Sequence, residues 1–99
     1  MPEFLATGDD RIMELLTDTA DAMAAEFGLS RAEAVARVNE YWSTRQDLLD
    51  DGLPTHEEAE YWASFIYYAE GTPFWRKDAD RSAWRPRPAP AEDSGFWTV

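Results

Sequence analysis

Apolar residues recur every three or four positions along three stretches of the chain, and each stretch ends near a glycine. Steps of this size place side chains on one face of an α-helix. In the first stretch the apolar stripe is Ile12, Leu16, Ala20, Met23 and Phe27. Thr7 or Asp9 can cap its start, and Gly28 suits the left-handed position that ends many helices. We therefore predict a helix over residues 9–27.

Two more helices are predicted by the same pattern. Ser30 and Glu33 form a capping box, which predicts a helix start at residue 31. The stripe that follows is Val35, Val38, Trp42 and Leu49, and it supports a helix over 31–50. Thr55 and Glu58 form a second capping box, followed by the apolar face of Ala59, Trp62, Ala63, Ile66 and Ala69. A third helix is therefore expected over 55–70.

Residues 72–99 differ from the rest of the chain in the pattern of their prolines and tryptophans. Prolines alternate through residues 85–90 and exclude a helix there. Trp75, Trp84 and Trp97 are spaced between polar stretches, and we expect these rings to pack on the helices. The predicted fold is mainly α: one domain over 1–99, built as an irregular three-helix bundle with an extended Trp- and Pro-rich C-terminal arm across it. Whether the arm contains short strands is left open.

Composition agrees with a small globular domain, since 44% of the 99 residues are hydrophobic and 29% are charged. There is no cysteine, which excludes disulfides and thiolate chemistry. The N-terminus lacks the basic and apolar regions of a signal peptide, and no apolar run approaches the ~18 residues of a membrane span. We expect a cytoplasmic protein without a membrane partner.

The net charge of −11 is unevenly distributed. Residues 1–70 hold 16 acidic and four basic residues, whereas residues 71–99 hold four acidic and five basic ones. This body repels nucleic acid and attracts a basic partner. The alternative interpretation is that the acids only solvate helix faces.

The segment 23–31 is similar to the centre of a helix-turn-helix motif, with Gly28 in the turn. In such a motif the second helix enters the major groove of DNA, and Arg31 and Arg37 would be its cations. Acidic residues dominate the surrounding sequence, so a capped helical hairpin is favoured over a small DNA-binding regulator.

A metal or acid–base site is the next candidate. His56 and Glu60 are four residues apart and would share a face of the third predicted helix. One histidine without cysteine offers no second nitrogen ligand, and the H-E-x-x-H spacing is absent. We therefore predict no metal, no cofactor, no catalytic residues and no enzymatic activity, with His56 and Glu60 as the weak metal candidates.

The favoured hypothesis is a protein-binding surface on the third predicted helix. Tyrosines are common interface anchors, and an acidic rim speeds the capture of a basic partner. The proposed partner-binding residues are Tyr61, Tyr67, Tyr68, Glu57 and Glu58. Packing of these rings inside the same chain is the alternative, and a structural homodimer that uses the same aromatics is another.

Several segments carry a family resemblance: His56–Ala63, Ile66–Tyr68, Trp75, Trp84 and the ending from Ser94 to Thr98. Together they resemble short, acidic, uncharacterised proteins of high-GC Gram-positive bacteria over about residues 28–99. This resemblance implies no activity and no residue roles. By class analogy, small acidic bacterial proteins include immunity proteins and antitoxins that neutralise basic nucleases. The best hypothesis is thus a non-enzymatic binding module, an inhibitor or immunity-type protein for a basic partner.

Overall fold

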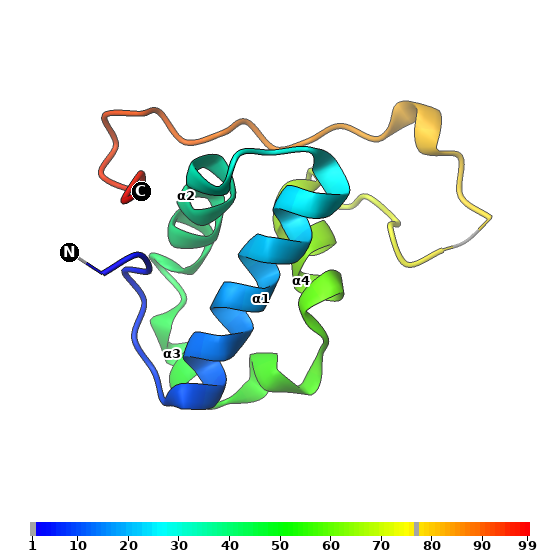
Figure 1. The fold of residues 1–99 in the computed structure, drawn as a ribbon. Coiled ribbons are helices and arrows are strands. Elements are labelled where there is room, and N and C mark those ends of the chain that lie inside the picture. Colours follow the sequence, from blue (N-terminus) through cyan, green and yellow to red (C-terminus); the bar gives the residue numbers. More distant parts are fainter. Residues whose placement is uncertain (1, 77) are drawn as a thin grey trace.

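The computed structural model describes residues 2–76 and 78–99. It contains four α-helices in this part of the chain: α1 (Asp10–Phe27), α2 (Arg31–Trp42), α3 (Gln46–Asp50) and α4 (Ala59–Tyr67). Two short 3-10 helices, η1 (Leu53–His56) and η2 (Arg81–Ala83), complete the set. Helix α1 lies between α2 and α4 and packs on both (Figure 1). The mainly α prediction is confirmed.

Helix α1 matches its predicted bounds because both of its ends are built from local signals. The Asp9 carboxylate accepts a hydrogen bond from the Ile12 amide at 3.1 Å, and Gly28 ends the helix with a left-handed φ of 67°. Four members of the predicted stripe, from Ile12 to Met23, are buried, and Phe27 is half-buried. A side chain at Gly28 would be strained in this conformation.

The predicted helix over 31–50 is wrong in one respect: it breaks at residues 43–45 into α2 and α3. Side chains compete there for the last carbonyls of α2, since Ser43 Oγ donates to the Glu40 carbonyl and Arg45 Nη1 to the Tyr41 carbonyl. The stripe still reaches the core, because Leu49 is 2% exposed on the far side of the turn.

The predicted helix over 55–70 is shorter than expected, because α4 begins at Ala59. Thr55 does not form the predicted capping box. Its hydroxyl donates back to the Gly52 carbonyl at 2.6 Å, and the Trp62 indole donates to the Pro54 carbonyl at 2.8 Å. These bonds hold residues 53–56 as the 3-10 turn η1, and Glu58 becomes the residue that precedes α4.

The core lies where α1 meets α2 and α4. Its centre consists of side chains that are at most 2% exposed, including Leu16, Ala20, Met23, Val35, Val38, Trp42, Leu49, Ala63 and Ile66. The aromatic rings of Tyr41, Trp42 and Trp62 extend this core toward α4: Trp42 meets the other two rings edge-on, and Tyr41 and Trp62 are tilted against each other. Such ring pairs add about 0.5–1.5 kcal/mol beyond the area that they bury.

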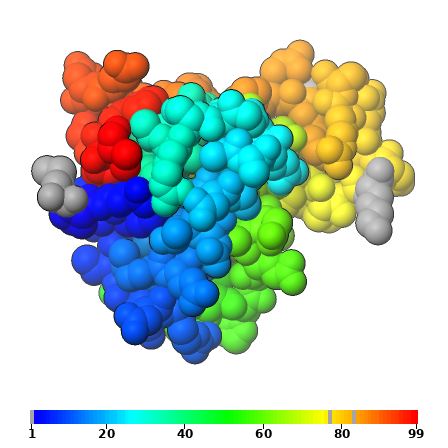
Figure 2. Space-filling view, viewed as in Figure 1, coloured from blue at the N-terminus to red at the C-terminus, as the bar shows by residue number. Residues whose placement is uncertain are grey.

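After α4 the chain first forms a lobe over residues 71–76 and 78–84, which was not predicted, and then the extended arm, which was. The lobe, coloured yellow to orange in Figure 2, projects beyond the helices at one end. The arm then returns across the helices toward the N-terminus. It is bound to the end of α4 by a hydrogen bond from the Ala69 amide to the Arg85 carbonyl at 2.9 Å, and by another from the Arg87 amide to the Tyr67 carbonyl at 2.7 Å. Among the described residues the arm forms a single β-bridge, between Tyr68 and Pro86.

The prediction that all three arm tryptophans pack on the helices is wrong for Trp75, which is 64% exposed. Phe74 packs against Tyr61 and Phe65, and Trp75, which follows it in the chain, remains in solvent. Trp84 meets the Tyr68 ring, with 5.1 Å between centroids. Trp97 is half-buried and donates its indole N–H to the Pro90 carbonyl within the arm itself.

Asn39 on α2 joins the two ends of the chain. Its side chain is 2% exposed, accepts from the Leu5 amide at 3.0 Å, and donates to the carbonyls of Glu3 and Phe96 at 3.2 and 2.9 Å. The Thr98 hydroxyl also donates to the Glu3 carbonyl. N-terminal and C-terminal segments therefore lie side by side against α2. No helix in the described part of the chain is long and apolar enough to cross a membrane.

Candidate functional site

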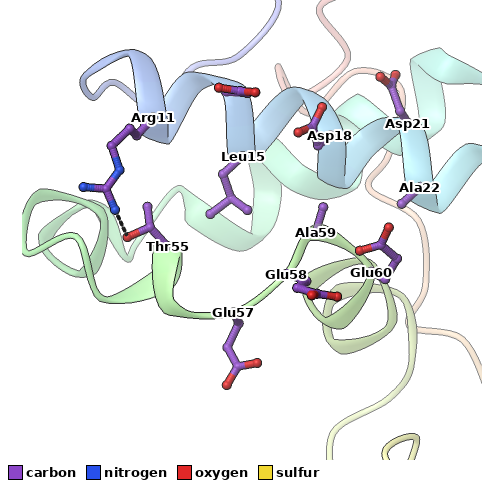
Figure 3. A pocket seen from close by; sticks show the side chains of 11 residues that line it. Arg11, Leu15, Asp18, Asp21, Ala22, Thr55, Glu57, Glu58, Ala59 and Glu60 are labelled. Carbon is purple, nitrogen blue, oxygen red and sulfur yellow. Dashed lines mark hydrogen bonds between the residues drawn. The ribbon is translucent and has the colours of Figure 1, made fainter.

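A groove lies between α1 and the η1–α4 connection and has a volume of about 670 Å³ (Figure 3). Six carboxylates line it: Glu14, Asp18, Asp21, Glu57, Glu58 and Glu60. Leu15, Ala22 and Ala59 give it an apolar floor, and Arg11 is the only cation on its wall. We call this feature the acidic groove.

One wall of the acidic groove follows from the sequence of α1. Glu14, Asp18 and Asp21 are spaced by four and three residues, so they share the helix face beside the buried stripe. All three are exposed. Like-charged side chains at this spacing repel each other within the helix. That arrangement raises the negative potential along this face of α1.

The opposite wall is set by the turn that precedes α4. Glu57 and Glu58 connect η1 to α4, and Glu60 lies in the first turn of α4. Carboxylates here are favoured by the positive end of the helix dipole. Arg11 Nη2 donates to the Thr55 hydroxyl at 3.0 Å and ties this turn to α1. In Figure 3 the Glu57 carboxylate points away from α1, whereas Glu60 lies between the two helices.

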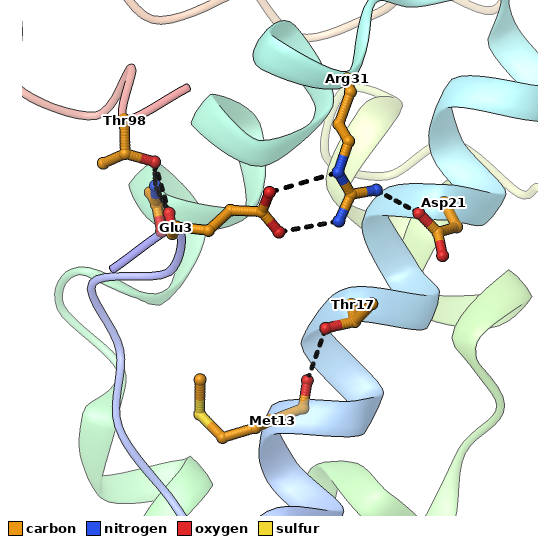
Figure 4. A network of polar contacts seen from close by, with 7 residues as sticks. Glu3, Met13, Thr17, Asp21, Arg31 and Thr98 are labelled. Carbon is orange, nitrogen blue, oxygen red and sulfur yellow. Dashed lines mark hydrogen bonds and ion pairs between the residues drawn. The ribbon is translucent and has the colours of Figure 1, made fainter. Parts of the chain in front are cut away.

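The groove is electrostatically uncompensated along most of its length. Asp21 pairs with Arg31, but no described base lies within 4 Å of the other five carboxylates. Arg31 also forms a forked pair with Glu3, with Nη2 to Oε1 at 2.7 Å (Figure 4). That hydrogen bond raises the pKa of the Arg31 guanidinium. Arg31 does not line the groove and reaches it only through its ion pair with Asp21.

No family model matches this chain, and no curated protein and no solved structure matches it. Function must therefore be inferred from the geometry of the site itself.

The structure brings Glu57 and Glu58 together with the α1 carboxylates but places the three predicted tyrosines elsewhere. All three are half-buried. Tyr67 stacks on Phe27 with 3.9 Å between centroids, and Tyr68 meets the same ring edge-on. Tyr61 lies at the other end of α4. The structure therefore separates the acidic and aromatic parts of the predicted surface, and Tyr67 and Tyr68 pack within the chain.

His56 and Glu60 lie in different elements, so the predicted spacing on one helix face does not apply to them. His56 ends η1 and lines a second cavity beside Asp50 and Asp51, whereas Glu60 lines the acidic groove. Within the described residues, no group of three or more acids and histidines is arranged to hold a metal ion.

The two arginines of the helix-turn-helix hypothesis both form hydrogen bonds and ion pairs within the chain. Arg31 bonds to Glu3 and Asp21. The Arg37 side chain is 8% exposed, pairs with Glu33 at 2.9 Å, and donates to the Arg87 carbonyl at 2.7 Å. Arg31 begins α2, but its guanidinium is held by two carboxylates, and Arg37 is buried in the second turn, whereas DNA recognition requires side chains at the start of this helix to meet base edges. This arrangement favours the capped hairpin.

The α1 wall of the acidic groove was not predicted from the sequence. Its signal was present in the spacing of Glu14, Asp18 and Asp21, but such spacing also describes any solvated helix face. Only the packing of α4 against α1 turns that face into one wall of a groove.

Proposed function

We propose that this chain is a non-enzymatic protein-binding module whose acidic groove holds a basic segment of a partner protein. The observation that carries the proposal is the set of six carboxylates around one groove, five of them without a described base within 4 Å. Concentrated like charges oppose folding. A cationic partner that enters the groove relieves this repulsion on binding.

The shape and floor of the groove favour lysine and arginine side chains. Their aliphatic stems can cover Leu15, Ala22 and Ala59 while their charged ends reach the carboxylates on both walls. The negative field also speeds the encounter with a basic partner, and it repels phosphates. We therefore expect a basic protein partner, and neither nucleic acid nor an anionic membrane. Such a binder fits the class of inhibitor or immunity-type proteins that act in the cytoplasm.

Tyr61 lies outside the acidic groove, next to the groove residue Glu60 in the sequence of α4. It is half-buried and packs on Phe74 with 5.4 Å between ring centroids, and we propose it as an aromatic anchor beside the groove. Aromatic residues that are already ordered lose little entropy when a partner covers them. In this proposal the carboxylates govern association, and Tyr61 slows dissociation.

The test compares two variants that remove the same charge from different places. Glu57→Gln with Glu58→Gln neutralises two groove carboxylates, whereas Glu92→Gln with Asp93→Asn neutralises two exposed carboxylates on the arm. Partners from a native extract are coupled to the protein with a zero-length carbodiimide, which joins carboxylates to lysines, and the joined residues are mapped by mass spectrometry. Association rates of a captured partner are then measured at low and high salt.

We expect cross-links at the groove carboxylates and slower association of the groove variant only, by about tenfold at low salt. Thermal unfolding of both variants controls for stability, because the carboxylates beside α4 also interact with its dipole by about 0.3–1 kcal/mol each. Cross-links confined to other surfaces, or equal association rates for the two variants, would overturn the proposal.

A structural homodimer is the second candidate. It is favoured by apolar side chains left in solvent, since Leu53 and Trp75 are 58% and 64% exposed. Light scattering at increasing concentration tests it, and a monomer at every concentration excludes it.

A further inference from the structure

A third, smaller pocket lies where α2, the turn before α3, α4 and the arm meet. Its volume is about 120 Å³, and it is lined by Arg37, Glu40, Tyr41, Arg45, Ile66, Arg87 and Pro88. Three arginines from three separate segments thus surround one small space, in a chain whose net charge is −11. We call this feature the arginine pocket.

The three guanidinium groups have donors to spare. Arg37 is 7% exposed and uses Nε and Nη1 within the fold, on Glu33 and on the Arg87 carbonyl. Arg45 is hydrogen-bonded through Nη1 alone, to the Tyr41 carbonyl at 2.6 Å. Arg87 Nη2 donates to the Phe65 carbonyl, but its Nε is buried and has no hydrogen-bond partner in the described part of the chain. A buried donor without a partner points to an ion or water that completes the site.

Two of the three pocket arginines are not paired with a carboxylate. Arg37 pairs with Glu33 at 2.9 Å, whereas Arg45 and Arg87 have no carboxylate within 4 Å among the described residues. Glu40 is the one carboxylate on the pocket wall.

The Tyr41 hydroxyl responds to both of these cations. Burial raises the pKa of Tyr41, and the charges of Arg45 and Arg87 lower it. Glu70 acts on the same hydroxyl in the raising direction. The Arg45 guanidinium lies over the Tyr41 ring, 4.2 Å from its centroid, and Arg87 lines the same pocket, while Glu40 on the pocket wall limits its positive charge.

We propose that the arginine pocket, formed by Arg37, Arg45 and Arg87, binds a small oxyanion such as phosphate. Guanidinium groups match the oxygens of phosphate and carboxylate through charge-assisted hydrogen bonds. The volume lies well below the roughly 300–1,000 Å³ of pockets for drug-sized ligands, which favours a small ion over a nucleotide. This site goes beyond the proposed function, because the acidic groove attracts the opposite charge. A bound anion would link α2 to the arm and stabilise the folded arm.

The test is a titration with inorganic phosphate at constant ionic strength, followed through the arginine Nε–Hε resonances in NMR spectra. The native protein should show a saturable shift of the Arg87 Hε signal, with a Kd of about 10 mM or tighter. Arg45→Gln should weaken binding about tenfold, because it removes a charged donor. Arg85→Gln is the matched control, since this exposed arginine lies on the same arm outside the pocket.

Glu40→Gln provides a gain of binding that a purely structural role of the arginines would not produce. It removes the carboxylate on the pocket wall and should tighten phosphate binding severalfold. A parallel titration with acetate distinguishes a carboxylate ligand from phosphate, and a saturable response to either anion supports the site. A linear response to both anions, or equal affinities in the Arg45→Gln and Arg85→Gln variants, would overturn the proposal.

Discussion

Replacing Asn39 with alanine removes the group that joins both ends of the chain to α2. Its three shortest hydrogen bonds are lost, one accepted from the Leu5 amide and two donated to the Glu3 and Phe96 carbonyls, together with a longer one to the Thr98 hydroxyl at 3.5 Å. A fully buried group left without a partner costs about 1–3 kcal/mol. Because Glu3 and Phe96 are only half-buried, water can reach them after a local opening. We therefore take about 1 kcal/mol for each bond and predict a loss of about 3 kcal/mol in the free energy of unfolding.

A loss of about 3 kcal/mol is large for a domain of 99 residues, whose total stability is of the order of 5–15 kcal/mol. The corresponding fall in the melting midpoint is roughly 12–24 °C. Urea unfolding measures the free energy, and amide hydrogen exchange at Leu5 shows whether the ends detach before the helices unfold. Glu40→Ala is the matched control, since this neighbour on α2 is exposed and should change stability by about 0.5 kcal/mol or less.

Asn39→Asp separates the acceptor from the donors at this position. The variant keeps an oxygen for the Leu5 amide but turns a carboxylate toward two carbonyl oxygens. Burial and these carbonyls raise the pKa of the new carboxyl in the folded state. Its protonated form stabilises the fold below the unfolded pKa of about 3.9, and this contribution is lost as the pH rises.

A loss of less than about 1 kcal/mol in the free energy of unfolding of Asn39→Ala, together with unchanged protection of the Leu5 amide, would contradict the role assigned to Asn39.

Three further predictions concern the arm and the aromatic residues. Deleting residues 82–99 should lower the free energy of unfolding by about 3 kcal/mol or more, because the arm is hydrogen-bonded to α4 and α2; an unchanged urea midpoint would contradict this. Trp75→Ala should change stability by about 0.5 kcal/mol or less, since Trp75 is 64% exposed. Trp42→Ala should cost about 3–5 kcal/mol, since Trp42 is 2% exposed. Similar shifts of the melting midpoint for both variants would be inconsistent with this packing. Burial raises the pKa of Tyr41 and Tyr68, so their contribution to stability is complete below about pH 10 and is lost at higher pH; unfolding measured from pH 8 to 11 should therefore show an alkaline decline that Tyr41→Phe reduces.

Most residues of the acidic groove and the arginine pocket have no feature in the local sequence that marks them as part of a site. Glu57 and Glu58 were predicted as a partner site from their position beside aromatic residues, and they do line the groove. The opposite wall on α1 and the arginine pocket were not predicted. Arg37 and Arg87 are 50 residues apart in the sequence, and only the return of the arm brings them within hydrogen-bond distance.

Local sequence patterns predict the class of fold, the bounds of α1, the start of α2 and the apolar stripes, because these depend on neighbours three or four residues away. Asp9, Ser30 and Gly28 act through their own backbone or the next turn, so their roles follow from local chemistry. Tertiary structure decided the break at residues 43–45, the late start of α4 and the role of Asn39. Each of these depends on which carbonyl accepts a hydrogen bond from a side chain, and that pairing is fixed only when distant segments pack together.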